Sequence, residues 1–303
     1  MNIKGNIKKV INKLPYIRWL VSELKKYKKN VWIEPGHYYS PIVSVEDIKR
    51  NGNFIFKKSI NKIEGIDLNE SNQFKLLNDL LNFYEEIPFE QEKNEKLRYY
   101  YNNDFYHYFD AISLYLLMRF FNPQKIIEIG SGFSSALMLD VNKIFFNNKI
   151  GLTFIEPFPD RLRHLTRPTD NFTLIEKFFR EEDLDLFNSL NRNDFLFIDS
   201  SHVVKTGSEL NTLLFEVLPT LKAGVKIHFH DIFFPFEYPK KWVLKENRSW
   251  NEAYFLRTFL MYNNQFEITL FNSFIETFYK DWLLNNMPLC SKSNGSSLWL
   301  SKL

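Results

Sequence analysis

The pattern of apolar and polar residues becomes regular from about residue 125 onwards. Short β-rich apolar runs alternate there with stretches that have apolar residues at helical spacing, the longest of them a predicted helix over 205–221. Alternation of this kind predicts βαβ units and a parallel sheet with right-handed crossovers. We therefore expect an α/β fold, a doubly wound and mostly parallel sheet, with seven strands at 126–129, 152–155, 172–175, 195–198, 225–229, 266–270 and 297–301.

The first hundred residues have a different pattern. Apolar residues at helical spacing predict two short amphipathic helices, one before and one after Pro15, and Pro15 suits a first helical position. Residues 31–70 are rich in Gly, Pro and Asn and are expected to be irregular, whereas helices are expected over 71–87 and 104–121. We therefore predict an N-terminal extension over residues 1–103 and an α/β domain over residues 104–303.

Composition and length narrow the class of protein. The chain has 303 residues, 45% hydrophobic and 25% charged, which excludes a disordered chain and a small disulfide scaffold. Cys290 is the single cysteine, so no disulfide can form within the chain. No apolar run is long enough to span a membrane, and the N-terminus lacks a signal-peptide pattern. A protein of the reducing cytoplasm is the prediction.

Charge is distributed unevenly along the sequence. The net charge is +3, but residues 1–30 hold eight Lys and Arg18 against Glu23 alone, so the remainder is acidic. An acidic body argues against nucleic acid as a partner. The basic N-terminal helices have the composition of peripheral membrane helices. The favoured interpretation is nevertheless that they pack on the domain or on a second copy, which leaves a homo-oligomer open.

Two glycines follow the first predicted strand, in the segment Glu128-Ile129-Gly130-Ser131-Gly132. They let the backbone turn sharply and approach a ligand, and the next helix offers free N–H groups, as in dinucleotide-binding loops. Ser135 stands where the third glycine of such a loop belongs. Glu128 is an anion close to the loop, which suits a ligand with a cationic amino group better than a pyrophosphate. S-adenosylmethionine has that amino group and a sulfonium.

A second carboxylate ends the second predicted strand. Glu156 lies 26 residues beyond Gly130, and a carboxylate at this strand end can accept hydrogen bonds from both ribose hydroxyls. The alternative is an ordinary surface carboxylate.

These residues, together with Phe195–Asp199 and Leu221–Gly224, resemble the motifs of class I S-adenosylmethionine-dependent methyltransferases, most closely the small-molecule O-methyltransferase-like branch. The resemblance implies the strand order 3-2-1-4-5-7-6 with the last strand antiparallel. It also implies that Gly130 and Gly132 cradle the methionine part, that Glu156 holds the ribose, and that Ser131 and Asp199 contact the cofactor. Where the family commonly has an acidic residue near the adenine, this chain has Lys177-Phe178-Phe179, and Phe178 is expected to cover the adenine face.

Candidate chemistry lies at the ends of the fourth and fifth predicted strands, in Asp199-Ser200-Ser201-His202 and His228-Phe229-His230-Asp231. Methyl transfer to a hydroxyl needs a base, and His202 or His230 fits that role with Asp199 or Asp231 as its orienting partner. A hydrogen-bonded network that only holds the loops is the alternative. Asp199 and Asp231 also match in position the acidic pair of metal-dependent O-methyltransferases. A divalent metal therefore stays open, although Ile232 replaces the further acidic or amide residue of those enzymes.

The sequence thus predicts methyl transfer from S-adenosylmethionine to a hydroxyl oxygen of a small-molecule or saccharide acceptor. Aromatic residues of the loop 233–239 and of the N-terminal part are candidates for the roof of the acceptor pocket. A first rival is a nicotinamide-dependent (NAD) oxidoreductase, which Glu128 and the absent third glycine disfavour. A second is a non-catalytic cofactor-binding or scaffolding protein, which the intact pairs of histidines and aspartates disfavour.

Overall fold

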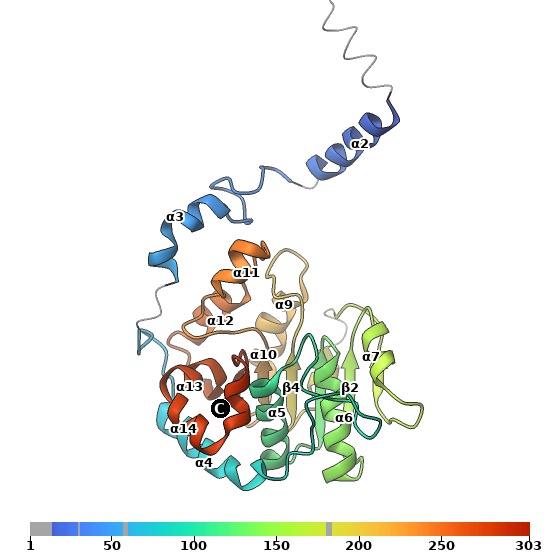
Figure 1. Ribbon diagram of the computed structural model, residues 1–303, viewed down its shortest axis with the longest axis vertical. Coiled ribbons are helices and arrows are strands. Elements are labelled where there is room, and N and C mark those ends of the chain that lie inside the picture. The colour runs from blue at the N-terminus through green and yellow to red at the C-terminus, as the bar shows by residue number, and fades with distance from the viewer. Residues whose placement is uncertain (1–13, 30, 57–59, 180–183) are drawn as a thin grey trace, which may run out of the picture. The chain divides into compact units, whose positions relative to one another are not determined.

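A computed structural model describes residues 14–29, 31–56, 60–179 and 184–303 (Figure 1). The chain forms two compact units, one of Met1–Lys57 with Lys240–Ser249 and one of Lys58–Pro239 with Trp250–Leu303. The second unit contains the sheet, and we call it the catalytic unit; the first is the basic unit. The predicted boundary between residues 103 and 104 stays a prediction.

The strands of the catalytic unit are β1 (Lys125–Ile129), β2 (Gly151–Ile155), β3 (Thr173–Ile175), β4 (Phe195–Ile198), β5 (Lys226–Phe229), β6 (Phe266–Phe271) and β7 (Leu298–Lys302). Its helices are α4 (Glu70–Tyr84), α5 (Tyr108–Phe121), α6 (Phe133–Phe146), α7 (Asp160–Leu165), α8 (Leu184–Phe187), α9 (Glu209–Thr212), η2 (Leu213–Val217), α10 (Leu218–Thr220), α12 (Glu252–Leu260), α13 (Asn272–Phe278), α14 (Lys280–Asn286) and η3 (Pro288–Lys292). The basic unit contains α2 (Pro15–Lys29), α3 (Val45–Ile55) and α11 (Lys240–Lys245).

The seven strands form one sheet in the order β3-β2-β1-β4-β5-β7-β6. Strands β1 to β5 pair in parallel, and β7 pairs antiparallel with both β5 and β6. This confirms the fold class and the predicted strand order. The order reverses between β1 and β4, so the carboxyl ends of these two strands open onto the crevice where doubly wound sheets bind ligands.

The central strands are apolar throughout because both faces of the sheet are covered. All four residues of β4 are buried, and so are four of the five residues of β1. Helix α5 is buried along most of its length and packs beside α4 and α6. The catalytic unit therefore has a rigid core directly beneath the ends of β1, β4 and β5.

Two predicted elements differ from the structure. Residues 31–70 were expected to be irregular, but α3 forms there because Ser44 caps it by accepting a hydrogen bond from the Asp47 backbone N–H. Residues 205–221 were expected to form one long helix. They form the short helices α9 and α10 on either side of the π-helical turn η2. The predicted helix before Pro15 falls on residues 1–13, outside the described residues.

The segment before α5 is anchored to the sheet's helices by a buried ion cluster. The Arg98 guanidinium contacts Asp140 of α6 at 2.6 Å and also binds Asp170, and all three side chains are buried. The backbone N–H groups of Arg98 and Tyr99 donate to the same Asp140 carboxylate. Because an unpaired buried charge is costly, this cluster fixes the path of residues 98–106 towards the ends of β4 and β5.

Candidate functional site

The loop after β1 is held by contacts that require glycine at position 130. Gly130 has φ +84°, and a Cβ there would lie 1.7 Å from the backbone oxygen of Asp199. Its N–H donates to the carbonyl of Ile155, and the N–H of Ser131 donates to the Glu156 carboxylate at 3.0 Å. The loop thus brings together the ends of β1, β2 and β4, as the sequence predicted for a ligand-binding turn.

Glu128 lies beneath this loop and is fully buried. Ser134 and Ser135 donate their hydroxyl hydrogens to its two carboxyl oxygens, and Ser135 also accepts from the N–H of Gly132. Burial raises the pKa of Glu128 to about 8, so the group is largely neutral at pH 7. Its contacts are those of a clamp that shapes the glycine loop. The predicted contact between Glu128 and a cationic amino group stays a prediction.

Glu156 lies at the mouth of a cavity of about 260 Å³ beside the loop. Its carboxylate oxygens accept hydrogen bonds from the backbone N–H groups of Ser131 and Phe158. These bonds fix the carboxylate but leave each oxygen a further acceptor position. The cavity is lined by Ile129, Gly130, Ile155, Glu156, Pro157, Phe158, Lys177, Phe178, Phe179, Asp199, Ser200, Ser201 and Glu209.

Two exposed phenylalanines line this cavity. Phe178, the predicted cover for an adenine, meets Phe158 edge to face with ring centroids 5.6 Å apart. Both rings are more than half exposed, so they offer apolar surface to a flat ligand. Phe158 was not predicted, because its position after Pro157 carries no pattern that separates it from other loop aromatics.

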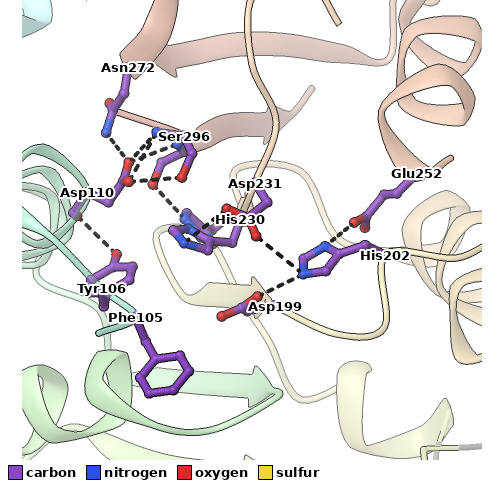
Figure 2. Close-up of polar contacts among 12 residues, drawn as sticks. Phe105, Tyr106, Asp110, Asp199, His202, His230, Asp231, Glu252, Asn272 and Ser296 are labelled. Atoms are coloured by element: carbon purple, nitrogen blue, oxygen red, sulfur yellow. Dashed lines mark hydrogen bonds and ion pairs between the residues drawn. The ribbon is translucent and has the colours of Figure 1, made fainter. Parts of the chain in front are cut away.

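Beside this cavity, His202 lies among three carboxylates (Figure 2). Its Nδ1–H donates to Glu252 at 2.8 Å, while its Nε2 lies 3.3 Å from Asp199 and 3.7 Å from Asp231. Burial lowers the pKa of His202, but the Asp199 and Glu252 carboxylates outweigh it and raise the pKa well above the usual value. The indole of Trp250 covers the imidazole, with ring centroids 4.2 Å apart.

His230 and Asp231 complete the cluster. The Nε2 of His230 lies 3.6 Å from Asp231, so this carboxylate is within ion-pair range of both imidazoles. Burial lowers the pKa of His230, but Asp231 and Asp199 raise it above the usual value. Both His202 and Asp231 have φ +59°, a left-handed conformation that is uncommon for residues other than glycine. Strained backbone of this kind is concentrated at functional sites.

The predicted juxtaposition of Asp199, His202, His230 and Asp231 is therefore present, but their environments differ. Burial would raise the pKa of Asp199, yet His230 and His202 lower it below the usual value. Burial dominates at Asp231 and raises its pKa. Asp199 therefore ionises readily, whereas Asp231 keeps its proton more easily.

Glu252 is the member of the cluster that the sequence did not reveal. It begins α12, is fully buried, and has one carboxylate oxygen on His202, whereas burial raises its pKa. It lies 50 residues beyond His202, and the residues around it form no motif. Burial of a carboxylate at the start of a helix was the missing observation, and only the tertiary structure supplies it.

His228 belongs to the core and not to the cluster. It is fully buried, stacks on Phe197 with ring centroids 3.7 Å apart, and has its Nε2 3.0 Å from the Ser297 hydroxyl. Burial lowers its pKa well below the usual value, so this imidazole is neutral. The ring of His230 stacks beside it at a centroid distance of 5.7 Å, since side chains two residues apart in a strand lie on the same face of the sheet.

Asp110 secures the opposite side of the cluster (Figure 2). Its buried carboxylate accepts from the backbone N–H groups of Ser296 and Ser297 and from the amide of Asn272. The hydroxyl of Tyr106 donates to the Asp110 carbonyl, and the Tyr106 ring lies 5.2 Å from the His230 ring. These contacts position His230 from the side of α5.

The prediction that aromatic residues of the loop 233–239 cover an acceptor pocket is wrong for Phe234 and Phe236. Phe234 and Phe236 are almost fully buried and pack against Phe271, and Phe234 also contacts Phe274. Their rings are core, since they fill the space between this loop and the elements that follow β6. Trp250 does stand beside the cluster, and the half-exposed Phe105 stacks on Phe133, which follows the glycine loop.

Among the described residues, no group of three or more His, Cys, Asp or Glu side chains has the arrangement of a metal site. The imidazole of His202 lies within ion-pair range of both Asp199 and Asp231. The described helices include none that is long and apolar enough to cross a membrane.

Comparison with known proteins decides the family. The profile of a methyltransferase domain matches residues 127–232, which include the glycine loop, Glu156 and the cluster up to Asp231. An uncharacterised protein of Archaeoglobus fulgidus is 38% identical over 164 residues, which cover 52% of this chain and 74% of that protein. Residues 127–232 are a methyltransferase domain, which supports the resemblance to class I S-adenosylmethionine-dependent methyltransferases.

Solved methyltransferase structures are similar to this methyltransferase at low identity. The S-adenosylhomocysteine-bound Podospora anserina methyltransferase PaMTH1 has a TM-score of 0.41 and 14% identity, over 85% of this chain and 96% of its own. A Bacillus cereus O-methyltransferase in complex with S-adenosylhomocysteine has a TM-score of 0.39 and 13% identity, and the match covers 86% of this chain and 100% of that enzyme's chain. The family match does not favour the predicted alternatives of an oxidoreductase or a non-catalytic scaffold.

Proposed function

We propose that this methyltransferase transfers a methyl group to a hydroxyl oxygen of a small-molecule or saccharide acceptor, with His202 as the general base. The observation that carries the proposal is the position of His202, whose Nδ1 is bound by buried Glu252 and whose Nε2 faces Asp199 and Asp231. That arrangement leaves a single ring nitrogen to exchange a proton beside the cofactor cavity.

The residues around the cavity fit S-adenosylmethionine. Gly130 admits close approach of a ligand to the backbone, Ser131 has a buried hydroxyl oxygen with no hydrogen-bond partner, and Glu156 keeps acceptor positions for ribose hydroxyls. Phe158 and Phe178 offer apolar surface to the adenine. We assign the methionine part to Gly130, Ser131 and Gly132 and the ribose to Glu156. When bound, S-adenosylmethionine supplies an electrophilic methyl group on a sulfonium.

The cluster then handles the proton of the acceptor. Glu252 holds the Nδ1–H of His202, so that Nε2 is the atom that takes the hydroxyl proton. Asp199, whose pKa is lowered by the two histidines, stabilises the imidazolium that results. Asp231 lies within ion-pair range of the imidazoles of both His202 and His230. Asp231 and His230 together hold the side of the cluster away from Glu252. We place His202 ahead of His230 because only His202 has a carboxylate on each ring nitrogen.

The acceptor class follows from the surface next to His202. Trp250 covers one face of the imidazole, and Phe105 presents a half-exposed ring near the glycine loop. Flat apolar rings beside carboxylates suit sugars and phenols, whose faces are apolar and whose edges carry hydroxyls. This supports a small hydroxylated acceptor.

Tritiated methyl transfer into cell extract tests the proposal, with the purified full-length protein, the His202→Ala variant and His37→Ala as a control at an exposed histidine. We expect label in a low-molecular-mass or saccharide product, retained by the control and reduced at least about 100-fold by His202→Ala. S-adenosylhomocysteine should bind all three proteins equally in calorimetry. Wild-type turnover by His202→Ala would exclude His202 as the base, and label in protein or nucleic acid would exclude the acceptor class.

A further inference from the structure

Helix α2 of the basic unit has two chemically opposite faces. At about 100° per residue, Tyr16, Ile17, Leu20, Val21, Leu24 and Tyr27 share one face of the helix. Arg18 and Lys26 fall on the opposite side, Lys25 lies at the edge beside Val21, and Lys28 lies between Ile17 and Val21 on the apolar face. A helix with a broad apolar face and a basic one has the composition that lies in a lipid–water interface.

The apolar face of α2 is exposed. Tyr16 is 68% exposed and Leu24 is 53% exposed, and Leu20 and Tyr27 are exposed as well. Trp19 stacks on Tyr16 with ring centroids 5.9 Å apart and is itself exposed. Aromatic residues thus flank the aliphatic residues of the helix. Trp and Tyr concentrate at membrane interfaces because one end of each ring system is apolar and the other is polar.

A second exposed aromatic group lies in the same unit. Trp32, Tyr38 and Tyr39 are all exposed, and Tyr39 contacts both of the other rings, at centroid distances of 6.0 Å and 5.3 Å. The loop that carries them is closed by hydrogen bonds from Gly36 N–H to the Ile42 carbonyl and from Ser40 N–H to the His37 carbonyl. Exposed large aromatics in a formed loop indicate an interaction surface.

The charge of the chain follows the two units. The basic unit contains 16 Lys and Arg against five Asp and Glu, and the catalytic unit contains 23 against 31. The net positive charge of the protein therefore belongs wholly to the unit that carries the exposed aromatics. Anionic lipid headgroups attract a basic amphipathic helix of this kind at physiological salt.

We propose that the basic unit docks the protein on an anionic membrane surface, with the apolar face of α2 inserted among the lipids and its basic face at the headgroups. The aromatics at 32–39 add a second interfacial contact. A second copy is disfavoured as the occupant because two strongly basic units repel one another. Nucleic acid is disfavoured because it offers no apolar layer for Leu20, Val21 and Leu24.

Vesicle co-sedimentation of the full-length protein tests the proposal. The probes are vesicles of phosphatidylcholine alone and of phosphatidylcholine with about 30 mol % phosphatidylglycerol, at low and high salt. We expect binding to the anionic vesicles only, weakened by high salt. The double variant Lys25→Glu with Lys26→Glu and the double variant Leu20→Ser with Leu24→Ser should each weaken binding at least about tenfold.

Matched controls carry equivalent charge-reversing and apolar-to-serine changes on exposed residues of the catalytic unit. Lys75→Glu with Lys143→Glu and Phe215→Ser with Leu284→Ser should bind vesicles as the wild type does. The thermal midpoint of each variant shows that it is folded.

Three results would overturn the proposal. One is equal binding to neutral and anionic vesicles, or none to either. Another is a protein whose molecular mass shows a dimer that Leu20→Ser with Leu24→Ser converts to a monomer, since α2 would then cover a second copy. The third is a lower thermal midpoint of the catalytic unit in the α2 variants together with no vesicle binding, since α2 would then pack on the protein's own surface.

Discussion

The Nδ1–H of His202 donates to the Oε2 of Glu252 at 2.8 Å, and both side chains are buried. The bond joins the loop after β4 to the first residue of α12. It decides which ring nitrogen is free to meet an acceptor, and it holds the pKa of His202 above its usual value. The chemistry of the site therefore depends on a residue that no sequence motif contains.

Glu252→Gln should shift the pH dependence of methyl transfer. The glutamine can still accept the Nδ1–H bond but has no charge, so the pKa of His202 falls. If His202 acts as a base, activity requires its neutral form. The acidic limb of the kcat/KM profile should then move to lower pH by about one unit.

Glu216→Gln, a change at an exposed glutamate of η2, should leave that profile where it is. An unchanged profile in Glu252→Gln, or one in which activity falls as the pH rises through the His202 pKa, would show that the imidazolium only holds the loops.

Glu128→Gln should stabilise the protein at alkaline pH. Burial raises the pKa of Glu128 from 4.5 to about 8, so the folded state binds the proton more tightly than the unfolded state. The associated stabilisation is complete below pH 4.5 and is lost as the pH rises towards and through about 8. Relative to the variant, the wild type should lose on the order of 4 kcal/mol of unfolding free energy over this window.

Denaturant unfolding at pH 5 and pH 8.5 measures that difference, and calorimetry with S-adenosylhomocysteine gives a separate result. A clamp role predicts an affinity within about threefold of wild type. An affinity that falls much further would instead support the direct contact with a cationic amino group that the sequence predicted.

Gly130→Ala and Gly207→Ala form a matched pair, because both glycines have positive φ. A Cβ at Gly130 would lie 1.7 Å from the Asp199 carbonyl oxygen, whereas nothing lies within 4 Å of one at Gly207. We expect Gly207→Ala to cost about 1 kcal/mol from backbone strain alone. Gly130→Ala should cost about 3 kcal/mol more and abolish S-adenosylhomocysteine binding. Similar thermal midpoints and affinities for both variants would contradict the close approach of Gly130 to the Asp199 backbone.

Methyl transfer should persist in excess chelator. His202 Nε2 lies within ion-pair range of Asp199 and Asp231. The imidazole thus occupies the position between the two carboxylates that a metal ion would otherwise take. The measurement is tritium transfer with and without EDTA. Loss of activity that Mg²⁺ restores would establish a divalent metal as a cofactor.

The sequence by itself predicted the sheet and several of the residues that line the cavity beside the glycine loop. Each strand of a parallel sheet is a short apolar run, and ligands meet its carboxyl ends, so Gly130, Glu156 and Asp199 could be placed by chain position alone. Periodicity did not reveal the π-helical turn at Leu213–Val217, since a π-turn and an α-turn present similar apolar spacing.

Only the tertiary structure decided what each polar group does. Glu128 became a buried clamp because Ser134 and Ser135 reach it, and Glu252 joined the cluster because α12 begins beside His202. The rings of Phe234 and Phe236 became core for the same reason. Burial and pairing depend on contacts between residues far apart in the sequence, and these set the pKa values and exposures on which the chemistry depends.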